Sequence, residues 1–132
     1  MIDLHTHTLY SDGELIPAEL WRRAQVKGYR YLAITDHVDA SNFEVVFTRL
    51  KTAALSLNRG DYPVLIPGLE FTHLPPALIG PLTAQARALG VPLIVVHGES
   101  LAEPVAPSLS PRASLVVTAL ETNRGTLSNP KG

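Results

Sequence analysis

The sequence predicts an α/β fold in which parallel strands are joined by crossover helices. Four apolar runs alternate along the chain with three segments of helical pattern, and a histidine or a carboxylate follows each run. Continuous apolar runs are typical of strands buried on both faces of a parallel sheet, and their crossovers are right-handed by default. The four runs begin at Ile2, Tyr31, Val64 and Pro92.

The first strand ends in His5-Thr6-His7. Side chains two residues apart share one face of a strand, so His5 and His7 project together, with Asp3 on the same face. Two neutral imidazoles suit a divalent transition metal, and the Asp12 carboxylate in the turn that follows can hold a second ion or orient a ligand. So short a motif also occurs where the histidines have no metal role. The residues at the ends of the other predicted strands therefore decide whether this one is a metal site.

A helix and a second strand come next. The helix is predicted to begin at Pro17 and to end at Gly28, since proline favours the first turn and glycine the end of a helix. The strand from Tyr31 ends at Thr35-Asp36-His37. Asp36 is interpreted either as the carboxylate that orients a metal-bound imidazole or as a turn or helix-capping residue.

The second helix and third strand span the middle of the chain. Ser41 followed by Glu44 fits a capping box, and apolar residues recur at helical spacing as far as Leu57. The strand from Val64 leads to Glu70, with His73 three residues further on. A continuing strand would place His73 on the opposite face from Glu70, which favours a loop histidine over a ligand or substrate contact.

The third helix is predicted at about 76–89, with a kink or restart at Gly80-Pro81 inside it. The fourth strand ends at His97-Gly98-Glu99. All four strands therefore deliver a histidine or a carboxylate at their carboxyl ends, where α/β barrels and open α/β sheets place their chemistry. This convergence predicts a metal site.

Taken together, these motifs resemble the PHP (polymerase and histidinol phosphatase) domain, closest to its stand-alone, histidinol-phosphatase-like members. The likeness covers about residues 1–107. The family fold is a distorted seven-stranded, TIM-like (βα) barrel, so the resemblance implies that this chain forms the N-terminal half of one. The matching motifs, in order, are His5-Thr6-His7-Thr8 with Ser11-Asp12-Gly13, then Thr35-Asp36-His37, Gly68-Leu69-Glu70 and His97.

The resemblance also implies a cofactor of two or three divalent ions, drawn from Zn, Mn, Fe and Mg, and a metal-dependent phosphoesterase activity. It implies His5, His7 and Glu70 as ligands of the first ion, Glu70 and His97 as ligands of the second, and Asp12 with His37 at the third. Asp36 and Glu70 are the candidate catalytic residues. Clustered metals lower the pKa of a bound water from about 15.7 toward about 7, so that hydroxide is available to attack phosphorus. The expected substrate is a small phosphate monoester such as histidinol phosphate or a nucleotide.

The sequence departs from the family pattern near Pro104. No histidine follows His97 and no acidic residue follows Glu121, so each of the three metal positions lacks one family ligand. We therefore expect a partial PHP domain at 1–107 and a Pro/Ser/Thr-rich tail at 108–132. The tail is predicted as loop or disorder, although one apolar run in it could add a strand. The alternative hypothesis is a truncated or frame-shifted, non-catalytic fragment with at most weak metal binding.

Length and composition add further expectations. A complete barrel needs about 200 residues or more, and this chain has 132, so four strands would leave an open edge able to self-associate. The net charge of −1 gives no electrostatic case for nucleic acid or an anionic membrane. The absence of cysteine excludes disulfides and thiolate sites. With no membrane span and no signal peptide in the sequence, we expect a cytoplasmic protein.

Overall fold

Strands and helices alternate along the chain as the sequence predicts. The computed structural model describes residues 1–97 and 116–119, with the backbone alone for the second range. Its elements, in chain order, are β1 (Ile2–Thr6), α1 (Pro17–Val26), β2 (Tyr31–Ile34), β3 (His37–Val38), α2 (Phe43–Leu57), β4 (Val64–Phe71), α3 (Pro76–Ala88), β5 (Leu93–His97) and β6 (Val116–Ala119).

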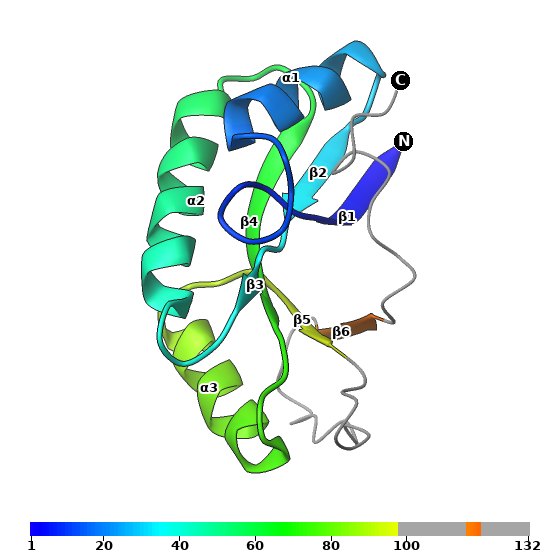
Figure 1. Cartoon of the computed structure of the whole chain (residues 1–132). Coiled ribbons are helices and arrows are strands. Elements are labelled where there is room, and N and C mark those ends of the chain that lie inside the picture. The colour runs from blue at the N-terminus through cyan, green and yellow to red at the C-terminus, as the bar shows by residue number, and fades with distance from the viewer. Residues whose placement is uncertain (98–115, 120–132) are drawn as a thin grey trace.

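The strands form a sheet in which every observed pair is parallel. Its order is β1-β2-β4-β5-β6, with β3 beside β4. Along the chain, each strand in this order is added at the same edge of the growing sheet, as in a barrel. In a doubly wound sheet, by contrast, the order of strand addition reverses partway and continues at the other edge. The helices α1, α2 and α3 lie on one side of the strands (Figure 1). The predicted fold class of parallel strands with crossover helices is confirmed, and the arrangement is consistent with part of a TIM-like barrel.

The hydrophobic core lies between the helices and the sheet. Alternate strand residues enter it, including Leu69 and Phe71 of β4 and Ile94 and Val96 of β5. Full burial of one such side chain contributes about 1.5–3 kcal/mol. Because successive strand residues point to opposite faces, Glu70 lies on the face away from the helices. The same packing that orders the core therefore orients the polar face of the sheet. The helix residues that complete the core include Leu20, Ala24, Phe43, Phe47, Leu50, Ile79 and Leu82.

Several local details differ from the sequence predictions. The capping box is wrong, because α2 begins at Phe43 and the backbone N–H of Ser41 donates to Asp39 Oδ1 at 2.7 Å. Pro81 lies inside a single helix, α3. Strand β3 was not predicted, since two residues carry no periodicity.

The predictions for the C-terminal segment are tested only in part. Strand β6 pairs with β5, with His97 beside Ala119 in the register, so the apolar run at this point does form a strand. The rest of the predicted tail at 108–132, the position of Glu99 and the departure near Pro104 lie outside the described residues.

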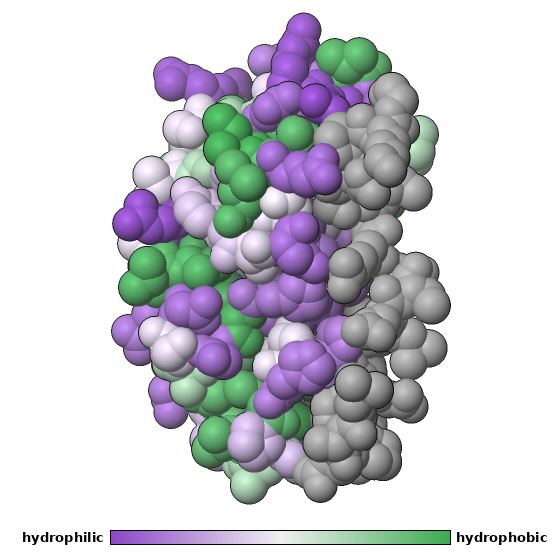
Figure 2. Space-filling view, in the orientation of Figure 1, coloured by the Kyte–Doolittle hydropathy of each residue, from purple (hydrophilic) through white to green (hydrophobic). Residues whose placement is uncertain are grey.

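The surface in Figure 2 mixes hydrophobic and hydrophilic residues over the helices, in several separate patches. Exposed apolar side chains include Val45 and Leu55 of α2 and Leu78 of α3. Within the described part of the chain, no helix is long and apolar enough to cross a membrane.

Candidate metal centre

The site is assembled from strand ends. His5 belongs to β1 and His7 follows it, while His37, Glu70 and His97 belong to β3, β4 and β5. In the register of β3 and β4, His37 lies directly beside Glu70. Three groups of potential metal ligands result, each with its ligand atoms within 4.8 Å of one another. They are His5, His7 and Glu70; His7, Asp12 and His37; and His37, Glu70 and His97. The structure thus brings together all six of the predicted metal ligands.

Glu70 lies at the centre of these groups. Its side chain is almost fully buried, with Oε2 at 2.9 Å from His5 Nε2 and Oε1 at 2.9 Å from His37 Nδ1 and 3.6 Å from His7 Nε2. Burial by itself raises the pKa of Glu70, but the imidazoles of His37 and His5 beside its oxygens outweigh burial and lower the pKa to about 2. Glu70 is therefore a carboxylate at neutral pH, the form that binds a cation.

His7 and Asp12 form the second side of the site. Burial lowers the pKa of the buried His7, against the opposing effect of the Glu70 and Asp12 charges. His7 is thus a neutral imidazole at pH 7, the form in which histidine binds metals. The exposed Asp12 has Oδ1 at 3.5 Å from His7 Nδ1 and Oδ2 at 3.4 Å from His37 Nε2.

The residues present fit a metal ion. His5 Nε2, His7 Nδ1 and Glu70 Oε1 are buried, yet none makes a hydrogen bond of normal geometry. Buried polar atoms are nearly always hydrogen-bonded, so this group of unsatisfied lone pairs needs an explanation. A divalent ion satisfies nitrogen and carboxylate donors together at bond lengths of about 2.0–2.2 Å. The mixed donor set suits Zn, Mn or Fe without selecting one of them.

Asp36 supports the loop that carries Asp12. Its fully buried carboxylate accepts hydrogen bonds from the backbone N–H of Thr8 at 2.7 Å, from the Thr8 hydroxyl at 2.7 Å and from the Ser11 hydroxyl at 2.6 Å. In the described structure these bonds go to the loop between β1 and α1 and not to an imidazole. The bonded residues lie 25 and 28 positions earlier in the sequence, so Asp36 links two segments of the chain, and both interpretations of Asp36 stay predictions. A direct part in catalysis stays a prediction.

Gly13 closes the same loop, and its replacement by alanine is expected to displace it. A Cβ at position 13 would lie 2.3 Å from the carbonyl oxygen of His7, a backbone atom that cannot move without moving this candidate ligand. We expect Gly13→Ala to cost about 1–3 kcal/mol of stability, as overpacking does. We also expect it to weaken metal binding at the group that contains Asp12. Thermal unfolding and a metal titration measure the two effects.

A matched control for this change is Gly80→Ala in α3. A Cβ at position 80 meets nothing within 4 Å, and alanine favours a helix over glycine by about 0.5–1 kcal/mol. This variant should unfold at or above the wild-type temperature and bind metal normally. Equal melting temperatures for Gly13→Ala and the wild type would contradict the expected clash.

Thr72 is a site residue that the sequence reasoning missed. Its hydroxyl donates to the carbonyl oxygen of Glu70 at 3.3 Å and lies 2.5 Å from His37 Nδ1. It therefore helps to fix the orientation of the His37 ring, as hydrogen-bonding partners of metal-binding histidines do. A single threonine after a strand carries no motif that would have indicated this contact.

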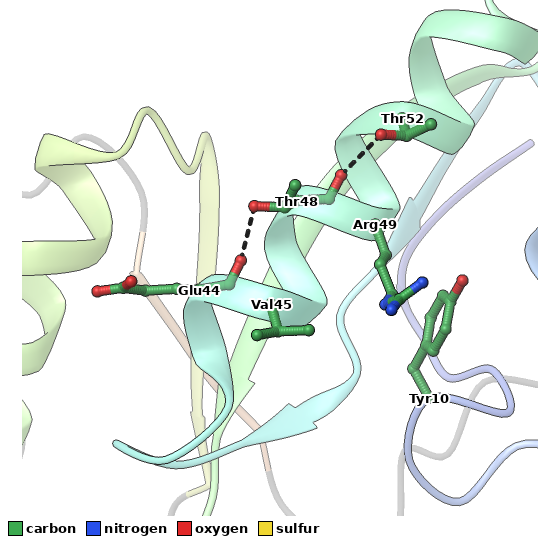
Figure 3. Close-up of a pocket in the computed structure, with 6 residues that line it drawn as sticks. All are labelled: Tyr10, Glu44, Val45, Thr48, Arg49 and Thr52. Atoms are coloured by element: carbon green, nitrogen blue, oxygen red, sulfur yellow. Dashed lines mark hydrogen bonds between the residues drawn. The ribbon is translucent and has the colours of Figure 1, made fainter.

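A separate pocket of about 530 Å³ lies between the β1–α1 loop and α2. In Figure 3 the side chains of Tyr10 and Arg49 approach each other across its mouth, and the Thr48 and Thr52 hydroxyls bond back to helix carbonyls at 2.8 and 3.0 Å. None of the six potential metal ligands lines it. It is therefore not the metal centre, although Tyr10 and Asp12 share one loop.

Imidazoles and carboxylates grouped at the carboxyl ends of parallel strands define an α/β domain with side-chain clusters that could hold metal ions. The sequence profile of the PHP domain matches residues 3–95. The chain belongs to the PHP domain family, as the resemblance of its motifs indicated. This family includes metal-dependent phosphoesterases and typically binds metal ions.

The relatives of this chain include proteins of archaea and bacteria. It is 46% identical over 114 residues to an uncharacterised protein of Methanocaldococcus jannaschii, covering 86% of this chain and 52% of that protein. It is 33% identical over 107 residues to a 5′-3′ exoribonuclease of Haemophilus influenzae, and the match covers 75% of this chain and 39% of that protein. It is 39% identical over 70 residues to a 5′-3′ exoribonuclease of Salmonella typhimurium, and the match covers 53% of this chain and 22% of that protein. The chain thus spans about half the length of the first relative and less of the other two.

Proposed function

We propose that this protein is a metal-dependent phosphoester hydrolase of the phosphatase type, acting on a small phosphate monoester in a histidinol-phosphatase-like reaction. The observation that carries the proposal is the shared position of Glu70, which belongs to two ligand groups and whose Oε1, 2.9 Å from His37 Nδ1, makes no hydrogen bond of normal geometry. A carboxylate shared in this way would serve as a ligand in both groups, and paired cations are typical of phosphoester hydrolysis.

The roles of the residues follow from the three groups. His5, His7 and Glu70 would hold one ion, His37, Glu70 and His97 a second, and Asp12 with His7 and His37 a third. When bound, the ions would supply Lewis-acid stabilisation of the phosphoryl oxygens and an acidified water as nucleophile. Thr72 would fix the His37 ring, and Asp36 would hold the Asp12 loop through Thr8 and Ser11.

A second candidate substrate is the 5′ end of an RNA strand. The observation in its favour is the name 5′-3′ exoribonuclease, carried by relatives that match 75% and 53% of this chain. Such an enzyme also cleaves a phosphoester, so the same ligand groups would serve it. The net charge of −1 weighs against it, because nucleic-acid binding draws its affinity from lysine and arginine contacts with phosphates.

The test begins with the metal content of the purified full chain, measured by mass spectrometry, and continues with three substrates: a chromogenic phosphate monoester, histidinol phosphate and a short 5′-phosphorylated RNA. We expect at least one tightly bound divalent ion and turnover of a monoester, both lost in His7→Ala. A folded chain that holds no metal would overturn the proposal. Turnover of the RNA alone would establish the second candidate, and a metal-loaded chain that turns over neither monoester would overturn the proposed phosphatase activity.

A further inference from the structure

His73 is the one histidine that the three ligand groups leave out. It lies two residues beyond the end of β4, is exposed, and has a backbone φ of 57°. Residues other than glycine rarely adopt a positive φ, although histidine does so more often than most. Where the surrounding structure holds a residue in this conformation, the site is frequently functional.

The His73 ring lies next to the candidate metal centre. Its ring centroid lies 5.4 Å from that of His97, which in turn lies 5.9 Å from that of His37. His37 stacks on His7 at 4.4 Å, and His7 lies 5.0 Å from His5. The five imidazoles thus form one continuous row. His73 ends this row on the exposed side, beyond the buried His97.

His73 stands apart from the three ligand groups of the described residues. No group of three potential ligands among the described residues includes it. Its side chain is exposed and lies beside the ring of His97.

We propose that His73 is a substrate contact that donates a hydrogen bond to a phosphoryl oxygen of the bound phosphoester. The inference rests on the proposed function, since it requires a phosphoryl group at the ligand group of His37, Glu70 and His97. A phosphoryl oxygen is anionic, and hydrogen bonds to ionised acceptors are shorter and stronger than those between neutral groups. His73 would thereby set the affinity for phosphate without holding a metal.

The test compares the metal-loaded wild type with His73→Asn, using inorganic phosphate as the probe. Asparagine tolerates a positive φ, so the loop is retained while the imidazole is lost. We expect the dissociation constant for phosphate, measured by calorimetry, to rise about tenfold or more, as the loss of a hydrogen bond to a charged group predicts. KM for a phosphate monoester should rise with it, while kcat changes less. Metal content and melting temperature should not change.

Each other result has a distinct meaning. Unchanged phosphate affinity and KM in His73→Asn would overturn the inference alone, as would a metal-loaded wild type that binds no phosphate at millimolar concentration. Loss of one metal equivalent in His73→Asn would overturn it in favour of a metal ligand. A wild type that binds no metal would overturn the proposed function, and this inference with it. His73→Gly, which also accepts a positive φ, should repeat the loss of affinity and so guards against an effect peculiar to asparagine.

Discussion

Replacement of Glu70 by glutamine is expected to remove metal from two of the three ligand groups at once. Glu70 is nearly fully buried and touches His5 and His37 at 2.9 Å each. Glutamine keeps the volume of the side chain but removes the charge and leaves a single acceptor oxygen. Since loss of a residue that merely supports a ligand commonly costs 10- to 100-fold in metal affinity or activity, we expect more than about 100-fold for a ligand shared by two groups.

The measurement is metal content after dialysis, followed by metal titration and turnover of a phosphate monoester. Glu19→Gln is the matched control, because Glu19 is an exposed residue of α1 paired with Arg23 at 2.8 Å, and surface pairs contribute about 0–1 kcal/mol. This control should bind metal and fold as the wild type does. A Glu70→Gln protein that retains its full metal content would show that the imidazoles alone hold the ions.

The parts of this site that the sequence predicted are those set by strand periodicity. His5, His7, Glu70 and His97 lie at or next to the carboxyl ends of continuous apolar runs, and packing of Leu69 and Phe71 against the helices leaves Glu70 on the opposite face. Periodicity of two residues fixes the face of each side chain once the strand is located. The convergence of strand ends followed from parallel pairing alone.

The parts that were missed depend on single backbone angles and on loops. The sequence favoured a loop histidine at position 73, and β4 does end at Phe71, but the positive φ of His73 and the position of its ring beside His97 do not follow from residue spacing. Asp36 accepts hydrogen bonds from Thr8 and Ser11 only because the loop after β1 folds back toward the end of the neighbouring strand β2. In this loop the N–H of Gly13 donates to the carbonyl oxygen of Thr8 at 2.9 Å. Neither a φ angle nor a loop path follows from residue spacing.

Replacement of Asp36 by alanine is expected to destabilise the whole domain. The carboxylate is fully buried and accepts three short hydrogen bonds that join β2 to the loop following β1. Alanine leaves the backbone N–H of Thr8 and two hydroxyls without this acceptor, and breaking such a buried charged network costs about 3–5 kcal/mol. The melting temperature should fall by about 10 °C or more for a domain of this size.

Two further variants show whether the loss of stability comes from the hydrogen bonds of Asp36 or from the removal of any aspartate. Asp61→Ala removes an exposed carboxylate and should change stability by no more than about 0.5 kcal/mol. Asp36→Asn keeps the volume and one acceptor, so its stability should lie between those of Asp36→Ala and the wild type. An ion bound to the folded state alone raises the melting temperature, so saturating metal should stabilise Asp36→Asn less than the wild type if Asp36 positions Asp12. Equal stabilisation of the two proteins by metal would confine Asp36 to folding and would separate it from the metal centre.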